Sequence, residues 1–302
     1  MNRHALVLLA AGTITGTIAV PQRALWGEAG HRITAQAAVA ALPSEMPQFF
    51  RDAGPQLAYL NPEPDRWRAR DEAQRDPALD GATAPDHFLD LELIPAPNRA
   101  GALAARDRYA FADSLRAHRV DPATTGALPY AIMEVTQRLR VAFRLWRKAP
   151  NDTERRWIEA RIVNDAGILG HYVADGSNPA HTTIHYNGWV GANPAGYATD
   201  NRFHGRFESA FVQTQVKLAD VQPLVTPAPQ VFTALRPAVV SYFMQTHADV
   251  ERLYQLDKLS PFNATQQGSA HKAFAVERLV AGSSMLRDLW WTAWVTSAPL
   301  ER

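Results

Sequence analysis

The sequence predicts an all-α protein built as one multi-helix domain. Apolar residues recur at spacings of three and four over most of the chain, and no period-two alternation of the kind that indicates a strand persists. Hydrophobic residues make up 46% of the 302 residues and charged residues 20%, which is typical of a globular protein with a packed core. No internal repeat and no convincing boundary divides the chain, so we expect a single domain.

Six segments carry the helical pattern, and several have a physical reason to begin or bend at a particular residue. Pro129 suits the first turn of a helix, and Asn151 is a typical N-cap residue. Pro237 lies inside a longer helical pattern and is expected to kink it. The predicted helices, in chain order, cover 31–42, 128–148, 151–175, 202–221, 231–256 and 269–295.

Two long stretches, 54–103 and 182–201, lack the helical pattern and are rich in Pro, Gly and Asn. Loops of this length in a compact helical protein are usually functional or disordered. Their length alone leaves both of these alternatives open.

Residues 1–25 are predicted to be a signal peptide. A basic start is followed by an apolar run and by Pro21, which precedes Trp26. The run is too short and too interrupted by glycine to favour a membrane span, so we expect the protein to be secreted or periplasmic. Cleavage would remove Arg3 and Arg23 and no acid, which changes the net charge from +1 to −1. A near-neutral chain lacks the broad positive field of a dedicated nucleic-acid-binding protein.

The chain has no cysteine, so a tight transition-metal site would have to use imidazole and carboxylate ligands. His171 and Asp175 are four residues apart, and His204 and Glu208 repeat that spacing. Residues i and i+4 share one face of a helix and can bind the same ion. The alternative is that each pair is a solvent-exposed, hydrogen-bonded couple. His185 lies in the same region and is predicted to line the site loop instead of binding metal.

Three further stretches carry a resemblance to a known family: WGEAGH (26–31), PEPDRWRAR (62–70) and PDHFLDLE (85–92). The chain resembles the three-zinc single-strand-specific nucleases of the S-one/P-one type, which share a helical fold with bacterial zinc-dependent phospholipases C. In that superfamily the ligands follow a fixed order, beginning with an N-terminal Trp that binds zinc through its α-amino group and carbonyl. The matching residues here are, in order, Trp26, His31, Asp65, His87, His171, Asp175, His181, His204 and Glu208.

The resemblance implies three Zn²⁺ ions in a cleft flanked by the long loops. It also implies that a hydroxide shared by two ions attacks phosphorus. The implied ligands are Asp65, His87, His171 and Asp175 for one ion, Trp26, His31 and the bridging Asp175 for the second, and His181, His204 and Glu208 for the third.

The resemblance further implies substrate contacts beside the ligands. In HFLD (87–90), Phe88 would stack on a base and Asp90 would bond the base edge. Stacking tolerates any base, which fits a nuclease of low sequence preference. Arg68 would contact phosphate and act in catalysis together with Asp65. The alternatives are that Phe88 is a core aromatic residue and that Asp90 caps a helix or turn.

These features predict an exported zinc-dependent phosphodiesterase, and three functions remain open. The favoured one is a monomeric endonuclease, without a stable protein partner, that cleaves single-stranded DNA and RNA to 5′-phosphorylated products; a 3′-nucleotidase activity on nucleotides could accompany it. The second is a zinc-dependent phospholipase C acting on phosphoglycerides, because Asn178-Pro179 and FHGRFESAFV (203–212) are closer to phospholipase sequences. The third is a zinc-stabilised binding protein without turnover.

Overall fold

The computed structural model describes residues 27–298 and confirms an all-α fold in a single domain. Within that range every regular element is a helix, and the β-type pairing is limited to an isolated bridge between Tyr186 and Gly188. The predicted signal peptide, residues 1–25, and Trp26 lie outside the described residues. Among the helices of the described range, none is both long and apolar enough to cross a membrane.

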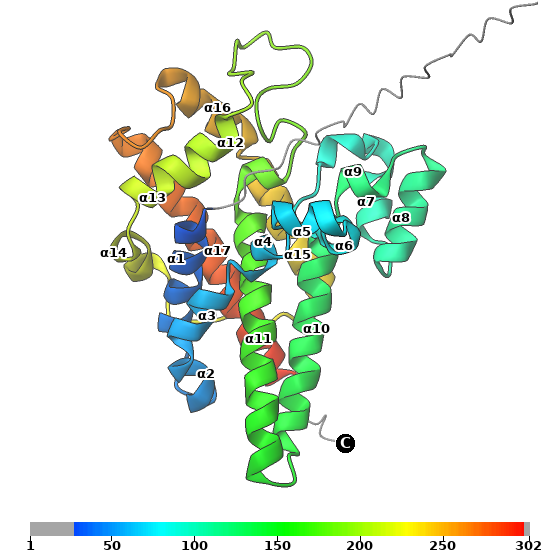
Figure 1. The fold of residues 1–302 in the computed structure, drawn as a ribbon, viewed down its shortest axis with the longest axis vertical. Coiled ribbons are helices and arrows are strands. Elements are labelled where there is room, and N and C mark those ends of the chain that lie inside the picture. The colour runs from blue at the N-terminus through cyan, green and yellow to red at the C-terminus, as the bar shows by residue number, and fades with distance from the viewer. Residues whose placement is uncertain (1–26, 299–302) are drawn as a thin grey trace, which may run out of the picture.

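Three long helices run along the molecule: α10 (Leu128–Arg147), α11 (Asp152–Ser177) and α17 (Ser269–Val295) (Figure 1). α10 and α11 form an antiparallel hairpin, and α17 packs against both of them. α1 (Glu28–Ala40) packs against α11 and α17. These four helices confirm four of the predicted segments close to their predicted bounds.

One predicted helix cap is confirmed, and one predicted helix kink is wrong. Asn151 accepts a backbone N–H hydrogen bond and caps α11, as the sequence predicts. The kink predicted at Pro237 is wrong. Pro237 lies in the first turn of α15 (Leu235–His247), where the missing N–H of proline needs no partner. The helical segment is interrupted instead at 248–249, before α16 (Val250–Leu259).

The predicted helix over 202–221 is divided into shorter pieces. Val216 and Lys217 adopt extended backbone conformations, which end one piece before the next begins. The middle piece is a π-helix, a form that is frequent at functional sites. The pieces are α12 (Phe203–Gly205), the π-helix η5 (Arg206–Phe211), α13 (Val212–Gln215) and α14 (Leu218–Val221).

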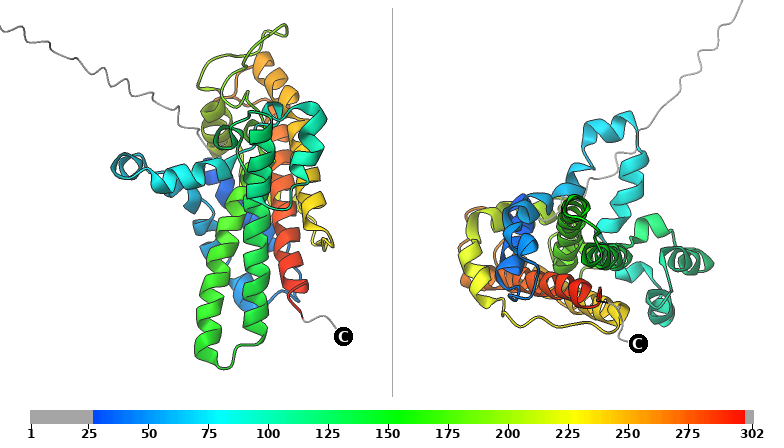
Figure 2. Two further views of the ribbon diagram at one scale, coloured as in Figure 1. Left: turned by 90° about the vertical axis from the view of Figure 1, so that its right-hand side faces the viewer. Right: turned by 90° about the horizontal axis from the view of Figure 1, so that it is seen from below.

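The prediction of a long loop over 54–103 is also wrong, because that stretch consists mostly of short helices, whereas 182–201 is free of helix as predicted. The short elements before α10 are α2 (Gln48–Asp52), α3 (Gly54–Leu60), α4 (Glu63–Arg66), α5 (Arg70–Arg75), α6 (Ala78–Thr83), η1 (Ala84–His87), η2 (Leu91–Leu93), η3 (Ala96–Asn98), α7 (Arg99–Leu103), α8 (Arg108–Ala117) and α9 (Pro122–Thr125). Those after α11 include η4 (Pro179–His181) and η6 (Gln222–Leu224). Prolines occupy the second position of α3, α4, η1 and η3, in the first turn where a missing N–H needs no partner. Figure 2 shows α5 and α6 projecting away from the long helices.

Apolar side chains form two buried clusters that meet at α11. Trp290 belongs to the cluster around α10, α11 and α17, and Phe207 belongs to the cluster around α1, η5 and α16. Val173 lies in the first cluster and Ala174 in the second. The stretch 171–175 of α11 therefore lies at the junction of the two clusters. Polar side chains there are withdrawn from water and need partners within the protein or a bound ion.

Candidate metal centre

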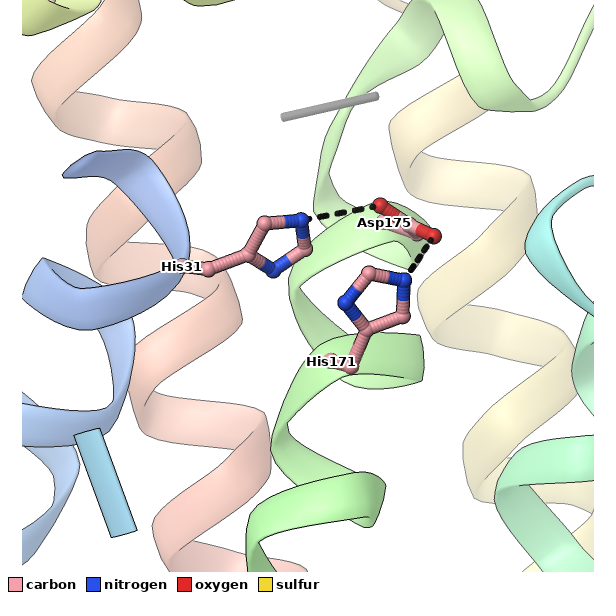
Figure 3. Close-up of side chains that lie close together, drawn as sticks. All are labelled: His31, His171 and Asp175. Atoms are coloured by element: carbon pink, nitrogen blue, oxygen red, sulfur yellow. Dashed lines mark ion pairs between the residues drawn. The ribbon is translucent and has the colours of Figure 1, made fainter. Parts of the chain in front are cut away.

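His171 and Asp175 lie one turn apart on α11, and His31 faces them from α1 (Figure 3). His171 Nε2 is 3.2 Å from Asp175 Oδ2, and His31 Nε2 is 3.6 Å from Asp175 Oδ1. The two imidazole rings are stacked, with centroids 4.2 Å apart. All three side chains are buried, which excludes the interpretation of His171 and Asp175 as a solvent-exposed couple.

Two residues from the short helices join these three. Asp65 lies in α4, and His87 ends η1. Asp65 Oδ1 is 3.4 Å from His171 Nε2 and 3.7 Å from His87 Nε2, and Asp65 Oδ2 is 3.8 Å from His31 Nε2. The Asp65 side chain is 25% exposed, whereas the other side chains are fully buried. We call His31, Asp65, His87, His171 and Asp175 the five-residue cluster.

His181, His204 and Glu208 form a second group, which we call the triad. His181 ends η4, His204 lies in α12 and Glu208 lies in the π-helix η5. Glu208 Oε2 is 2.8 Å from His204 Nε2 and 3.5 Å from His181 Nε2. His181 Nδ1 is 3.8 Å from Asp175 Oδ1, so the triad adjoins the five-residue cluster. All three triad residues are buried.

Hydrogen bonds at Nδ1 orient four of the histidine rings. Carbonyl oxygens lie 2.6–2.9 Å from these nitrogens: Asn61 Oδ1 for His31, Asn61 O for His171, Thr83 O for His87 and His87 O for His181. Because a carbonyl oxygen can only accept, Nδ1 carries the proton in each ring. The lone pair on Nε2 is then free to bind a cation, which is the arrangement expected of metal ligands.

The residues fit bound metal ions. Buried atoms that make no hydrogen bond within the described structure include Nε2 of His31 and of His87, Oδ1 of Asp65 and of Asp175, and Oε1 of Glu208. Leaving such atoms without a partner is costly, and a cation would satisfy them. Ligand atoms within 4.8 Å of one another form three groups: His31, His171 and Asp175; Asp65, His87 and His171; and His181, His204 and Glu208. Nitrogen and oxygen donors of this kind suit Zn²⁺ and related divalent metals.

The observed groups agree in part with the ligand sets that the resemblance implies. The triad coincides with one implied set. Asp175 lies close to both His31 and His171, but it belongs to one group only, whereas the resemblance implies a ligand shared by two ions. His171 differs, because its ligand atom belongs to two groups and not to one. Trp26, the ninth implied ligand, lies outside the described residues.

Burial and neighbouring charges shift the pKa values of the carboxyl groups in the metal-free protein. Burial raises the pKa of Asp65 to about 7 and that of Glu208 to about 8. Asp175 behaves in the opposite way: burial opposes its ionisation, but the imidazoles of His181 and His171 hold its pKa well below the usual range. Without a cation, Asp65 and Glu208 therefore tend to keep a proton near neutral pH, and bound dications would ionise them.

The predicted substrate residues lie beside the ligands but are largely covered. Arg68 is 10% exposed and donates from Nε to Asp80 Oδ1 at 3.2 Å. Phe88 is 8% exposed, and Asp90 is 4% exposed. The Phe88 ring packs against Gly126, whose φ of +86° favours glycine and where an added Cβ would lie 2.6 Å from Phe88 Cδ2. The loop before α10 therefore covers part of the Phe88 ring that is predicted to stack on a base.

Two asparagines hold side chains of the candidate metal centre, and this supporting role was not predicted for either of them, although Asn178 was noted in a phospholipase-like dipeptide. Buried Asn61 accepts from His31 with its side chain and from His171 with its backbone carbonyl. The sequence feature that could have indicated this contact is Gly170, a glycine inside a long helix. A Cβ at this position would lie 2.4 Å from Asn61 Nδ2. Asn178 donates from Nδ2 to Glu208 Oε2 at 3.2 Å, and its position just before η4 was the corresponding signal.

His185 lies in the 182–201 loop and is not a member of the three metal-binding groups. Its ring stacks on Trp189 with centroids 3.9 Å apart, and its Nδ1 accepts from the Val190 backbone N–H at 3.0 Å. The Tyr254 hydroxyl donates to the His185 carbonyl and anchors the loop on α16. These contacts give His185 a structural role in the loop.

Comparisons with known proteins give no match: no family model, no curated protein and no solved structure matches this chain. The family resemblance therefore depends on the motif residues alone.

Proposed function

We propose that this protein is an exported zinc-dependent phosphodiesterase that cleaves single-stranded DNA and RNA to 5′-phosphorylated products. The observation that carries the proposal is the meeting of eight implied ligands in three buried groups. These ligands come from α1, α4, η1, the end of α11 with η4, and the α12–η5 segment. Histidine and acidic side chains that bind no ion would lie mostly at the surface, because burying them without partners is costly.

Zinc ions bound there would stabilise negative charge on a phosphodiester and lower the pKa of a water molecule to near neutrality. The protein itself contributes rigid donors, because the Nδ1 hydrogen bonds fix the orientation of the imidazoles. Among the implied ligands that the structure describes, Asp65 is the one that solvent reaches, so substrate would approach on its side. Arg68, three residues further on, would bind phosphate oxygens with its planar guanidinium.

The nuclease function is preferred because of the residues that follow His87. A base held near the metal ions would meet the ring of Phe88 and the carboxylate of Asp90. Since Phe88 is 8% exposed and packs against Gly126, stacking would require the loop before α10 to move off the ring.

A second candidate, a zinc-dependent phospholipase C, is favoured by one contact. Asn178 donates to Glu208, and these two residues belong to the stretches that are closer to phospholipase sequences. The contact brings the two phospholipase-like stretches together at the triad, so phosphoglycerides remain the alternative substrate.

The decisive experiment combines metal content with substrate choice, using protein whose N-terminus is Trp26. We expect roughly three zinc ions per chain by mass spectrometry and cleavage of a single-stranded oligonucleotide. Hydrolysis of a short-chain phosphatidylcholine without cleavage of the oligonucleotide would replace the nuclease by the phospholipase. Full zinc content with neither activity would favour a binding protein, and far less zinc would contradict the site.

Phe88→Ala tests the base contact separately. The variant should bind single-stranded DNA more weakly, by about 1–3 kcal/mol for one stacked base. An oligonucleotide with an abasic position at the cleavage site should lose most of this difference between variant and wild type. Equal losses with intact and abasic substrates would show that Phe88 acts through packing against Gly126.

A further inference from the structure

A groove lies between α7 and α15, and none of the residues that line it belongs to the candidate metal centre. Its volume is about 470 Å³, which is within the range of small-molecule sites. Arg236, Pro237, Val240 and Met244 line one wall. These residues lie on one face of α15 and extend over about 12 Å of its length.

Most of the groove is apolar. Leu103 and small alanine side chains form the α7 wall, opposite Val240 and the 37% exposed Met244. Methionine adapts readily to a flexible chain, since its side chain is unbranched and polarizable. The walls therefore suit an aliphatic ligand.

Two arginines at the groove carry charges that no carboxylate neutralises in the contacts they make. Arg99 donates to the Ile94 carbonyl at 3.3 Å, and Arg236 donates to the Arg106 carbonyl at 2.7 Å. Arg99 Nε and Arg236 Nη1 make no hydrogen bond within residues 27–298. Nearby Arg108, by contrast, pairs with two carboxylates. Backbone oxygens hold the Arg99 and Arg236 guanidinium groups in place without cancelling their charge.

The helix end adds to this positive potential. α15 begins at Leu235, so its N-terminal end lies beside Arg236, and the helix dipole favours an anion there. The groove thus combines an apolar trough with a positive end.

We propose that the groove binds a free single-chain anionic amphiphile, a medium-chain fatty acid. The carboxylate would lie between Arg99 and Arg236, and the chain would follow Leu103, Val240 and Met244. Charge-assisted hydrogen bonds hold the carboxylate, and burial of the chain removes apolar surface from water. A sugar phosphate would leave the apolar walls unused, and a neutral lipid would leave both cations without a counterion. The proposal does not rest on the proposed phosphodiesterase function.

Methionine methyl groups give a direct readout. In protein labelled with ¹³C at the methionine methyls, monomeric decanoate should shift the Met244 signal in a saturable way and leave the core residue Met46 unchanged. Met244→Leu assigns the signal. The same shift should occur after zinc has been removed, which separates this site from the metal centre. Decanol should bind about tenfold more weakly, because it cannot form charge-assisted hydrogen bonds.

Variants test the roles of charge and shape. Arg99→Gln should weaken decanoate binding about tenfold and leave decanol binding unchanged. Ala100→Phe should fill the groove and abolish the binding of both decanoate and decanol. Arg252→Gln, on α16 and paired with Glu277, is the matched control and should bind decanoate normally. Equal affinity for decanoate and decanol, or no saturable shift of Met244, would overturn the proposal. A shift caused by phosphatidylglycerol vesicles but not by monomeric decanoate would overturn it in favour of a membrane contact.

Discussion

The two His-x-x-x-acid pairs of the candidate metal centre bring similar side chains together on different backbones. His171 and Asp175 lie on the regular helix α11, with Nε2 and Oδ2 3.2 Å apart. His204 and Glu208 span α12 and the π-helix η5, with Nε2 and Oε2 2.8 Å apart. A π-helical turn is wider than an α-helical turn, and the longer glutamate side chain suits that geometry. The same spacing in sequence therefore does not specify the same local structure.

The two pairs also differ in how many neighbours share their carboxylate. Asp175 lies within 4 Å of His31, His171 and His181. Glu208 lies that close to His181 and His204. In the five-residue cluster Asp175 and Asp65 both lie within 4 Å of His31 and His171, and Asp175 also reaches His181 of the triad. Among the described histidines, Glu208 contacts those of the triad alone, so the triad is the more separable site.

The largest expected effect comes from removing the shared carboxylate. Asp175→Asn preserves side-chain size but leaves a neutral, weaker ligand, so we expect the loss of about two zinc ions per chain. The Glu208→Gln variant should lose about one zinc ion per chain, because the Glu208 carboxylate belongs to the triad alone. Metal content measured by mass spectrometry on folded protein decides between these outcomes.

Asp165→Asn provides the control for this comparison. Asp165 lies on the same helix, is buried and pairs with Arg138 at 2.6 Å, but is not part of the metal centre. It should retain full metal content even if its stability falls. Equal metal loss in the Asp175 and Glu208 variants would show that the two sites are coupled as one unit.

Metal removal should lower the melting temperature by several degrees or more, because the ions bind the native state and not the unfolded chain. The drop should be smaller in Asp175→Asn, which has fewer ions to lose, and intermediate in Glu208→Gln. Calorimetry with and without a chelator measures the three values. An unchanged melting temperature in the wild-type protein would contradict a structural contribution from metal.

The two asparagines allow a finer comparison of the same sites. Asn61→Ala removes the acceptor that orients His31 but keeps the backbone carbonyl that orients His171. We expect about 10–100-fold weaker binding of one ion in the five-residue cluster. Asn178→Ala should weaken the triad ion instead, since Asn178 bonds Glu208. Competition with a chelator of known affinity measures each, and a uniform loss over all ions in either variant would contradict local control.

The sequence predicted the long helices and the residues that gather in the candidate metal centre better than the groups that support them. The apolar pattern identified α10, which has an apolar stripe facing the core, and also α11 and α17, which are long helices buried on several sides. Prolines misled the prediction of 54–103 and of α15, since a proline that starts a helix and one that interrupts a helix look alike in sequence. The role of Asn61 and the burial of Phe88 arise from contacts with residues far along the chain, Gly170 and Gly126. No local pattern specifies such contacts.

The smallest expected effect is a reversal of the pH dependence of stability when metal is removed. Burial raises the folded-state pKa of Asp65 to about 7 and of Glu208 to about 8, whereas carboxyl groups in the unfolded chain titrate near 4. The folded metal-free protein therefore binds more protons than the unfolded chain, and this stability is lost as pH rises through 7 and 8.

The histidines do not cancel this trend. Burial lowers the pKa of His31 and His87, so from pH 6.5 to about 7.5 the unfolded chain still binds more protons at these two residues, and they offset part of the trend. Although burial opposes it, the carboxylates of Asp175 and Asp65 raise the pKa of His171, which adds to the trend. Between pH 6.5 and 8 the free energy of unfolding of the metal-free protein should fall by on the order of 1–2 kcal/mol. The zinc-loaded protein should become more stable over the same interval, because metal binding requires deprotonated ligands. Denaturant titrations at both pH values, with and without zinc, give the two slopes. Slopes of the same sign would mean that protons and metal ions do not compete for Asp65 and Glu208.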